Sequence, residues 1–238
     1  MCRRHEGSRA AASTRRLRRR AAATPEWAWS YEGGWKGTLM GGRSRFRTAA
    51  FVMDYTNLQV QTPIGIGVFD IRNAAAATIR GVEVENRSRI GRGIEAGGHA
   101  TWLDATYDQY IAVNNLNVTG DVSGNRLNNA PEWAGRLWID WSGDVGSSGR
   151  LLVAADATAQ STVFYTPFND NIQRQSPYGL LGARVEYGPS HRRWTVAAYA
   201  RNLTNTDYIT ATFGTAPTAF GGRPGPSRQF AVEFTVRR

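Results

Sequence analysis

The chain has 238 residues, of which 41% are hydrophobic and 20% are charged, and its formal net charge is +10. No apolar run approaches the roughly 18 residues of a transmembrane helix, and a single cysteine, Cys2, excludes a disulfide framework and a cysteine-based metal site. The first twenty residues carry most of the excess charge, with eight Arg and one acid. The remainder is nearly balanced, so no nucleic-acid-binding surface is predicted over it.

Residues 1–23 form an Arg-rich segment without the apolar core of a secretory signal. Three interpretations stay open: a basic arm that binds nucleic acid or anionic lipid, a transit-like presequence, or a non-native start in front of a fragment. We favour the third, because a strand begins near Pro25 with no lead-in domain before it. We therefore predict a disordered segment at 1–23 and one structural unit at 24–238.

About nine strands are predicted from Trp27 onward, separated by connections that contain Gly, Ser, Pro and Asn. The strands span 27–39, 43–61, 77–89, 93–110, 134–145, 150–166, 179–188, 193–209 and 228–238. The connections alternate between short turns, at 40–42, 90–92, 146–149 and 189–192, and long loops, at 62–76, 111–133, 167–178 and 210–227. Short turns at one end and long loops at the other are typical of outer-membrane barrels, whereas a soluble sandwich would scatter its loop lengths.

The last strand has one apolar side and one polar side. Phe230, Val232, Phe234 and Val236 fall on one side of an extended chain, and Glu233 falls on the other. This pattern predicts that the four apolar residues face lipid and that Glu233 faces inward. A half-buried strand of a soluble sandwich shows the same alternation, so the rest of the chain decides between the two.

Aromatic residues gather near the predicted strand ends. They are Trp27, Trp29, Trp102, Tyr107, Tyr110, Trp133, Tyr165, Tyr199 and Tyr208. Amphipathic rings favour the headgroup level of a bilayer, so we expect these residues to form girdles. The alternative is that aromatic residues simply favour strands.

Side chains that bind metals or carry catalysis are sparse. His5, His99 and His191 are too scattered for a metal site. Glu83 and Glu85 share one strand face, which fits a polar row better than the acid and base of a glycosidase. We therefore predict neither an enzyme nor a bound cofactor.

Four segments, in this order, carry a resemblance to a known family. They are Glu32–Gly37 with Ala50–Gln59, then Asn73–Glu85, then Thr101–Tyr107, and finally Arg201–Tyr208 with Gly222–Gly225 and the last strand. Together they resemble the C-terminal half of the barrel of TonB-dependent outer-membrane receptors, over nearly all of 25–238. Two features depart from the family pattern: the chain ends Phe234-Thr-Val-Arg-Arg instead of on an aromatic residue, and no plug domain is recognised.

The resemblance implies an all-β fold, an antiparallel up-and-down transmembrane β-barrel segment of about nine strands, out of the roughly 22 of a full barrel. It implies a fragment of a receptor in the bacterial outer membrane that takes up a ferric siderophore or a similar nutrient. Its partners would be outer-membrane lipid, the barrel-assembly machinery, and the plug domain and TonB in the full-length parent. The alternatives are a self-contained small outer-membrane pore and a soluble β-sandwich that binds carbohydrate.

Ligand contacts are expected from the loops 111–133, 167–178 and 210–227, which the resemblance places outside the cell. The candidate ligand-binding residues are Asn115, Arg126, Asn169, Arg174, Tyr178, Phe213, Phe220 and Arg223. The Arg residues among them would suit an anionic ferric chelate, because charge-assisted hydrogen bonds are about twice as strong as neutral ones. The alternative is that these loops are solvated connectors.

Overall fold

A computed structural model describes residues 3–5, 24–65, 68–114, 118–190, 193–215 and 219–237. The predicted disordered segment at 1–23 lies outside the described residues except for Arg3–His5, which form the short strand β1 and pair with the start of β2. The described part of the chain contains no helix long and apolar enough to cross a bilayer.

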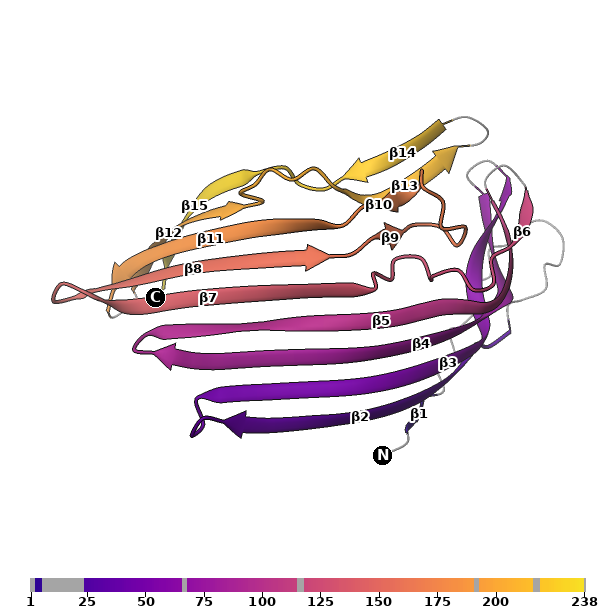
Figure 1. The fold of residues 1–238 in the computed structure, drawn as a ribbon. Helices are drawn as coiled ribbons and strands as arrows, with labels where there is room; N and C mark the ends of the chain where they lie inside the picture. Colours follow the sequence, from indigo (N-terminus) through magenta and orange to yellow (C-terminus); the bar gives the residue numbers. More distant parts are fainter. Residues whose placement is uncertain are drawn as a thin grey trace.

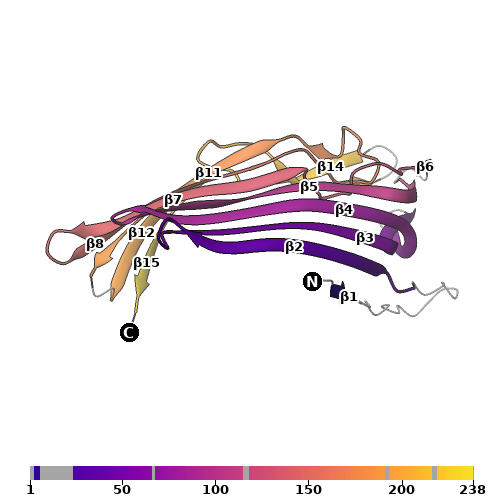
Figure 2. The ribbon, with the colours of Figure 1, turned by 60° about the horizontal axis from the view of Figure 1, so that its bottom comes forward.

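Nine long strands make one antiparallel sheet (Figure 1). They are β2 (Trp27–Leu39), β3 (Ser44–Gly65), β4 (Val68–Gly91), β5 (Ile94–Val113), β7 (Trp133–Val145), β8 (Gly149–Gln160), β11 (Tyr178–Pro189), β12 (Trp194–Arg201) and β15 (Gln229–Val236). Each pairs with the next long strand in sequence. Figure 2 shows the sheet curving, with β12 and β15 turned away from the plane of β2 to β5. The predicted all-β, up-and-down sheet of about nine strands is confirmed, and so is its character as part of a barrel wall.

The long-loop end holds more structure than the sequence predicted. Short strands occur there at β6 (Thr119–Asp121), β9 (Val163–Phe164), β10 (Arg174–Gln175), β13 (Ile209–Thr215) and β14 (Ala219–Pro224). β6 pairs with β5, β9 with β10, and β13 with β14. These pairings give the long connections their own hydrogen bonds, so they do not depend on solvent for them.

Three predicted boundaries are wrong. The stretch 62–76, expected to be a loop, lies almost entirely in a continued hairpin that pairs β3 with β4. Its register shifts twice between Tyr55 and Gln59, which breaks the alternation that strand prediction relies on. The predicted strand 150–166 ends at Gln160, and the predicted strand 193–209 ends at Arg201. In both cases the chain turns into the layer of loops described below.

One face of the sheet is apolar and exposed. Residues that pair directly across strands share a face, and one such row runs Trp141, Val153, Val185, Ala198 and Val232 from β7 to β15. The exposed apolar side chains of this face are Trp27, Trp29, Tyr31, Trp35, Leu39, Val82, Trp102, Trp133, Leu137, Ile139, Trp141, Val153, Leu181, Val185, Tyr187, Trp194, Val196, Phe230, Val232, Phe234 and Val236. A soluble monomer rarely exposes so large an apolar surface.

The opposite face is polar and carries ion pairs. Cross-strand or near-neighbour pairs join Arg47 to Glu85 at 3.4 Å and Arg136 to Asp156 at 3.4 Å. Exposed pairs of this kind contribute little stability each. Charged side chains are costly to place against hydrocarbon. Their presence on this face therefore indicates that it meets water or protein and not lipid.

Tryptophans mark two levels on the apolar face. Trp102 and Trp133 are directly paired toward the long-loop end, and Trp141 lies eight residues along β7 from Trp133. Eight strand residues span about 26 Å, or about 20 Å along a barrel axis at a tilt near 40°, comparable to the ~25 Å apolar band of outer-membrane barrels.

The girdle prediction is wrong for several tyrosines. Tyr107 and Tyr110 are buried on the polar side, where loops cover them. Tyr199 lies beside the guanidinium groups of Arg184 and Arg201 on the polar face. A tyrosine near a strand end therefore did not identify a girdle position in this chain. The four tryptophans of the prediction, Trp27, Trp29, Trp102 and Trp133, do lie on the apolar face.

Candidate functional site

An irregularity in β5 brings two tyrosines to one face. Ala77 pairs with Tyr107 and Ala75 pairs with Tyr110, and the register shifts between these pairs. Because Ala75 and Ala77 are two residues apart on a regular strand, they share a face, and so do their partners. Without the extra residue in β5, the two tyrosines would point to opposite sides of the sheet.

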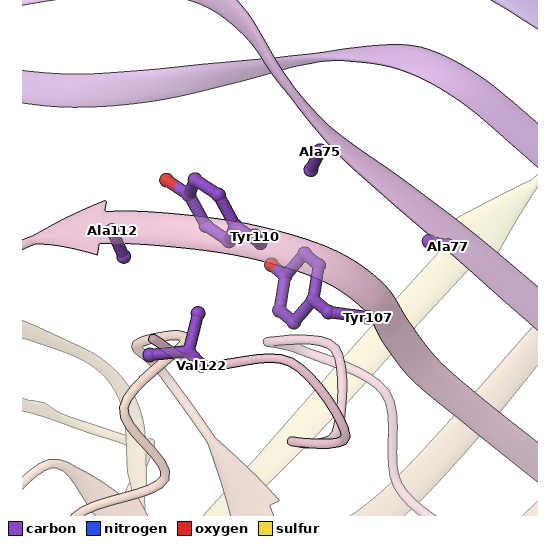
Figure 3. Packing of buried hydrophobic residues seen from close by; sticks show 6 residues of the cluster. All are labelled: Ala75, Ala77, Tyr107, Tyr110, Ala112 and Val122. Carbon is purple, nitrogen blue, oxygen red and sulfur yellow. The ribbon is translucent and has the colours of Figure 1, made fainter. Parts of the chain in front are cut away.

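The two tyrosines belong to a buried apolar cluster with Ala75, Ala77, Ala112 and Val122. Their ring centroids are 5.0 Å apart, and Ala112 and Val122 are buried beside them (Figure 3). The hydroxyl of Tyr107 donates a hydrogen bond to Oδ1 of Asn128 at 2.6 Å. Burial raises the pKa of Tyr107 from 10.0 to about 12, and the nearby Tyr110 makes a smaller contribution in the same direction. This phenol therefore stays neutral at physiological pH.

Two loops that are distant in sequence are locked together above this cluster. The backbone N–H of Arg126 donates to Oδ1 of Asn169 at 2.8 Å, and Nδ2 of Asn169 donates back to the Arg126 carbonyl at 3.0 Å. Nδ2 of Asn125 donates to the Pro167 carbonyl at 2.9 Å. Asn169 has a φ of 53°, a conformation that Asn adopts more readily than most residues. The loops therefore form one ordered layer on the polar side of the sheet.

The hairpin β13–β14 is attached to the same layer. The hydroxyl of Tyr165 donates to the Ile209 carbonyl at 2.6 Å, and the Ile209 N–H donates to Oε1 of Gln175 at 2.7 Å. Burial raises the pKa of Tyr165 above its usual value. Tyr178 and Tyr208 stack with ring centroids 4.6 Å apart.

This layer and the ends of β3 and β5 enclose a pocket of about 910 Å³. Its described lining comes from β3, β5, the two locked loops and β13: Leu58, Gln59, Val60, Gln61, Tyr107, Tyr110, Val113, Asn114, Leu127, Asn128, Tyr165, Thr166, Pro167, Phe168, Asp170, Ile172, Gln173, Thr212 and Phe213. A pocket of this size, lined by aromatic and aliphatic side chains together with amide, hydroxyl and carboxylate groups, could hold a small molecule.

Asp170 is the one charged side chain among the described lining residues. Its carboxylate accepts hydrogen bonds from the backbone N–H groups of Ile172, at 3.0 Å, and Gln173, at 2.7 Å, and from the Thr166 hydroxyl at 3.1 Å. Within the described ranges it forms no ion pair. No cluster of three or more His, Cys, Asp or Glu that could hold a metal ion occurs in those ranges either.

The structure places three of the predicted ligand-binding residues in or around this pocket. Phe213 lines it and is 60% exposed. Arg126 and Asn169 hold the two loops together, and the Arg126 guanidinium is occupied by Glu132 at 2.7 Å and by the Leu103 carbonyl at 3.2 Å. These two residues shape the pocket without lining it.

The remaining predicted residues lie elsewhere. Tyr178 begins β11 and stacks on Tyr208, and Arg174 and Arg223 are exposed on β10 and β14. Asn115 lies outside the described residues. Phe220 is described only as part of β14, opposite Gly214.

Several residues that line the pocket escaped prediction. Tyr107, Tyr110 and Tyr165 had been assigned to girdles, and Asp170 and Asn128 had not been singled out. The sequence signal that could have pointed to these residues was that 122–128 and 165–173 lie in or next to long connections between strands. The irregularity in β5 left no sequence pattern from which it could be recognised.

A family model described as TonB dependent receptor-like, beta-barrel matches residues 17–203. The match covers most of the chain, including β2 to β12.

Three solved structures, two of receptors and one of a transporter, share the fold. The ferric yersiniabactin uptake receptor FyuA from Yersinia pestis superposes with a TM-score of 0.75 at 17% identity, covering 90% of this chain and 30% of that one. The siderophore receptor PiuA from Acinetobacter baumannii gives 0.70 at 20% identity, covering 88% and 28%. The ferric citrate transporter FecA gives 0.66 at 18%, covering 89% and 31%. The chain thus spans about 30% of the length of these structures.

Proposed function

The chain belongs to the TonB-dependent receptor family, and from this we propose that it takes part in nutrient uptake across a bacterial outer membrane, with a ferric siderophore or a similar small chelate as ligand. The observation that carries the proposal is the pairing of two features in one sheet. One face is apolar and exposed from β2 to β15, and a small-molecule pocket lies at the long-loop end of the other face.

The apolar face supports a membrane location. Its side chains are the kind that lipid solvates, and the spacing of Trp133 and Trp141 along β7 is comparable to the height of the apolar band of an outer-membrane barrel. A soluble β-sandwich that binds carbohydrate would need to cover this face with a second sheet. The described residues provide no such layer on that side.

Residues 24–238 are proposed to be the C-terminal portion of a receptor barrel. In the described sheet, β2 and β15 lie toward opposite ends of the strand order. An open sheet edge cannot stay unpaired in hydrocarbon, so we propose that further strands complete the wall and that a plug domain occupies the lumen. TonB would then supply energy through the plug, and the barrel-assembly machinery would insert the barrel. The polar face, with its ion pairs, is the surface that the plug would meet.

The proposed role is transport without covalent chemistry. Among the described lining residues, the hydroxyls of Tyr107 and Tyr165 are engaged as hydrogen-bond donors, and the Asp170 carboxylate, which the Thr166 hydroxyl contacts, already accepts from two backbone N–H groups. Hydroxyl, amide and aromatic groups of this kind suit the binding of a small ligand.

Uptake of radiolabelled ferric chelates by whole cells tests the proposal. We expect cells that lack the gene to lose uptake of at least one chelate, and cells that lack TonB to lose the same uptake. Unchanged uptake in both strains, for hydroxamate, catecholate and carboxylate chelates alike, would contradict the proposed function.

A further inference from the structure

A shallow groove of about 400 Å³ lies on the apolar face of the sheet, across the neighbouring strands β11, β12 and β15 (Figure 1). The apolar side chains around it are those of Ala183, Val185, Ala198, Ala200, Phe230 and Val232. The register places Ala198 between Val185 and Val232, so a small side chain is flanked by two larger ones on the same face. The groove is therefore a depression in the apolar wall, with alanines at its floor.

The groove does not depend on the parts of the barrel that lie outside this chain. Further strands would pair with the edge of β15 in the plane of the sheet, and a plug would occupy the polar side. Neither would cover the apolar side, where Phe230 and Val232 are 71% and 76% exposed. In the proposed receptor the groove therefore faces the hydrocarbon of the bilayer.

A guanidinium lies at the long-loop end of this groove. Arg228 directly precedes β15 and falls on the same side of the extended chain as Phe230, which is two residues or about 7 Å further along. The Arg228 side chain is exposed, and its Nη1 donates to the Leu203 carbonyl at 3.5 Å, just beyond the end of β12. The segment 202–208 contains one acid, Asp207, and within the described ranges Arg228 forms no ion pair with it. The positive charge of Arg228 is therefore available to an anion at the edge of the apolar face.

Resting on the proposed function, we infer that Arg228 and the groove together bind one lipid of the outer leaflet, with a phosphate at Arg228 and an acyl chain in the groove. Arg forms strong charge-assisted hydrogen bonds to phosphate oxygens, and methyl, isopropyl and phenyl groups pack well against an acyl chain. The long loops of outer-membrane barrels lie outside the cell, so the lipid that reaches Arg228 belongs to the outer leaflet. Its chemical class is a phosphorylated, acylated glycolipid of the lipid A type.

The strands at the other end of the sheet carry the opposite charge on the same side. Arg80 also lies on the apolar side toward the long-loop end, but its direct cross-strand partner on β5 is Asp104. Two further carboxylates, those of Asp54 and Asp108, accept hydrogen bonds from the Thr78 hydroxyl. A phosphate near Arg80 would be repelled by these three carboxylates. The charge pattern therefore places the lipid at β15 and not at β3 to β5.

Native mass spectrometry of the full chain in detergent micelles tests the inference, with purified lipid A as the probe. We expect one lipid A to bind about fivefold more tightly than the same lipid without its phosphates, as for loss of an exposed ion pair. Equal binding of the dephosphorylated lipid would overturn the inference. Tighter binding of phosphatidylglycerol than of lipid A would overturn it as well, because the site would then fit a phospholipid better than the outer-leaflet glycolipid.

Two pairs of variants locate the site. Arg228→Gln should weaken lipid A binding about fivefold, and Ala198→Phe, which fills the groove at an exposed position, should weaken it at least as much. The controls are Arg80→Gln and Ala100→Phe, since Ala100 is exposed on the apolar face between Val84 and Gly135, outside the groove. We expect both controls to bind lipid A like the natural chain. Equal effects of the test variants and their controls would overturn the assignment to this groove.

The outcome for the lipid site is separable from the outcome for uptake. Gene-dependent uptake of a ferric chelate by cells, together with no binding of lipid A by the chain, would overturn this inference and leave the proposed function standing. Binding of lipid A through Arg228 and the groove, together with unchanged uptake in cells that lack the gene, would overturn the proposed function and support the lipid site.

Discussion

The guanidinium of Arg184 on β11 lies 3.5 Å from the carboxylate of Glu233 on β15, reaching across β12. It also contacts Glu186 at 2.8 Å on its own strand. Ala197 of β12 stands between Glu186 and Glu233 in the register, and its small side chain leaves room for the long guanidinium to cross. This contact lies on the polar face and places Glu233 on the side opposite its neighbour Phe234.

We expect the Arg184–Glu233 contact to contribute little stability. Both side chains are partly exposed, at 35% and 51%, so solvent screens the pair. A double-mutant cycle with Arg184→Gln and Glu233→Gln, measured by guanidinium chloride unfolding in detergent, should give a coupling energy of at most about 1 kcal/mol. A coupling energy several times larger would mean that water is excluded from the polar face more than the exposed fractions of these two side chains indicate.

Phe234→Arg should disrupt membrane insertion, and Thr235→Arg should not. Phe234 is 65% exposed on the apolar face, whereas Thr235 lies on the polar face and donates to Glu233. Arg on the lipid face of a barrel costs about 2–4 kcal/mol near the bilayer midplane. The yield of folded protein in outer-membrane fractions measures the effect. Similar yields for the two variants would be inconsistent with the assigned faces.

The pH dependence of stability should change when Tyr107 is replaced by Phe. Burial raises the pKa of Tyr107 to about 12, so the neutral phenol is favoured in the folded state. The resulting stabilisation is complete below the unfolded pKa of about 10 and is lost as pH rises through about 12, a loss of about 2–3 kcal/mol. Chemical unfolding between pH 9 and pH 12 should therefore show a steeper decline in the natural chain than in Tyr107→Phe. Parallel curves would show that Tyr107 is accessible to solvent.

Much of the fold could be predicted from the sequence, because the signals for strands and turns lie within short stretches of the chain. The strand Trp27–Leu39 was predicted with its observed bounds, and the tight turns lie where Gly, Ser and Pro occur. Strict alternation in the last strand also identified its apolar side. Turn residues and strand alternation both depend only on residues close together in the sequence, so they can be recognised without knowledge of the tertiary structure.

The candidate site was less predictable because it depends on contacts between distant residues. Asn169 was chosen as a ligand-binding residue from its loop, but its side chain is used to hold Arg126, 43 residues away. Tyr107 and Tyr110 share a face only because β5 has an extra residue between them. Loop composition indicated which end of the sheet forms the site, and it did not indicate which side chains turn inward.

Asn169→Ala should loosen the loop layer. The substitution leaves the Arg126 N–H and carbonyl without their partners, which costs about 1–3 kcal/mol when such groups are buried. Hydrogen exchange of the Arg126 N–H should then accelerate. Asn205→Ala is the control, because Asn205 has a similar φ of 51° and accepts from Arg228 in another loop. If both variants left exchange at Arg126 unchanged, the lock between the loops would not exist in solution.

The two-faced sheet is tested most directly by collisional quenching of single fluorophores in proteoliposomes. In a Cys2→Ser background, a cysteine at Leu137 or Val232 labels the apolar face, and a cysteine at Arg136 or Glu233 labels the polar face. We predict that brominated lipid quenches the first pair strongly and that aqueous iodide quenches the second. Equal quenching of all four positions by iodide, with none by brominated lipid, would contradict the account of this chain as part of a membrane barrel.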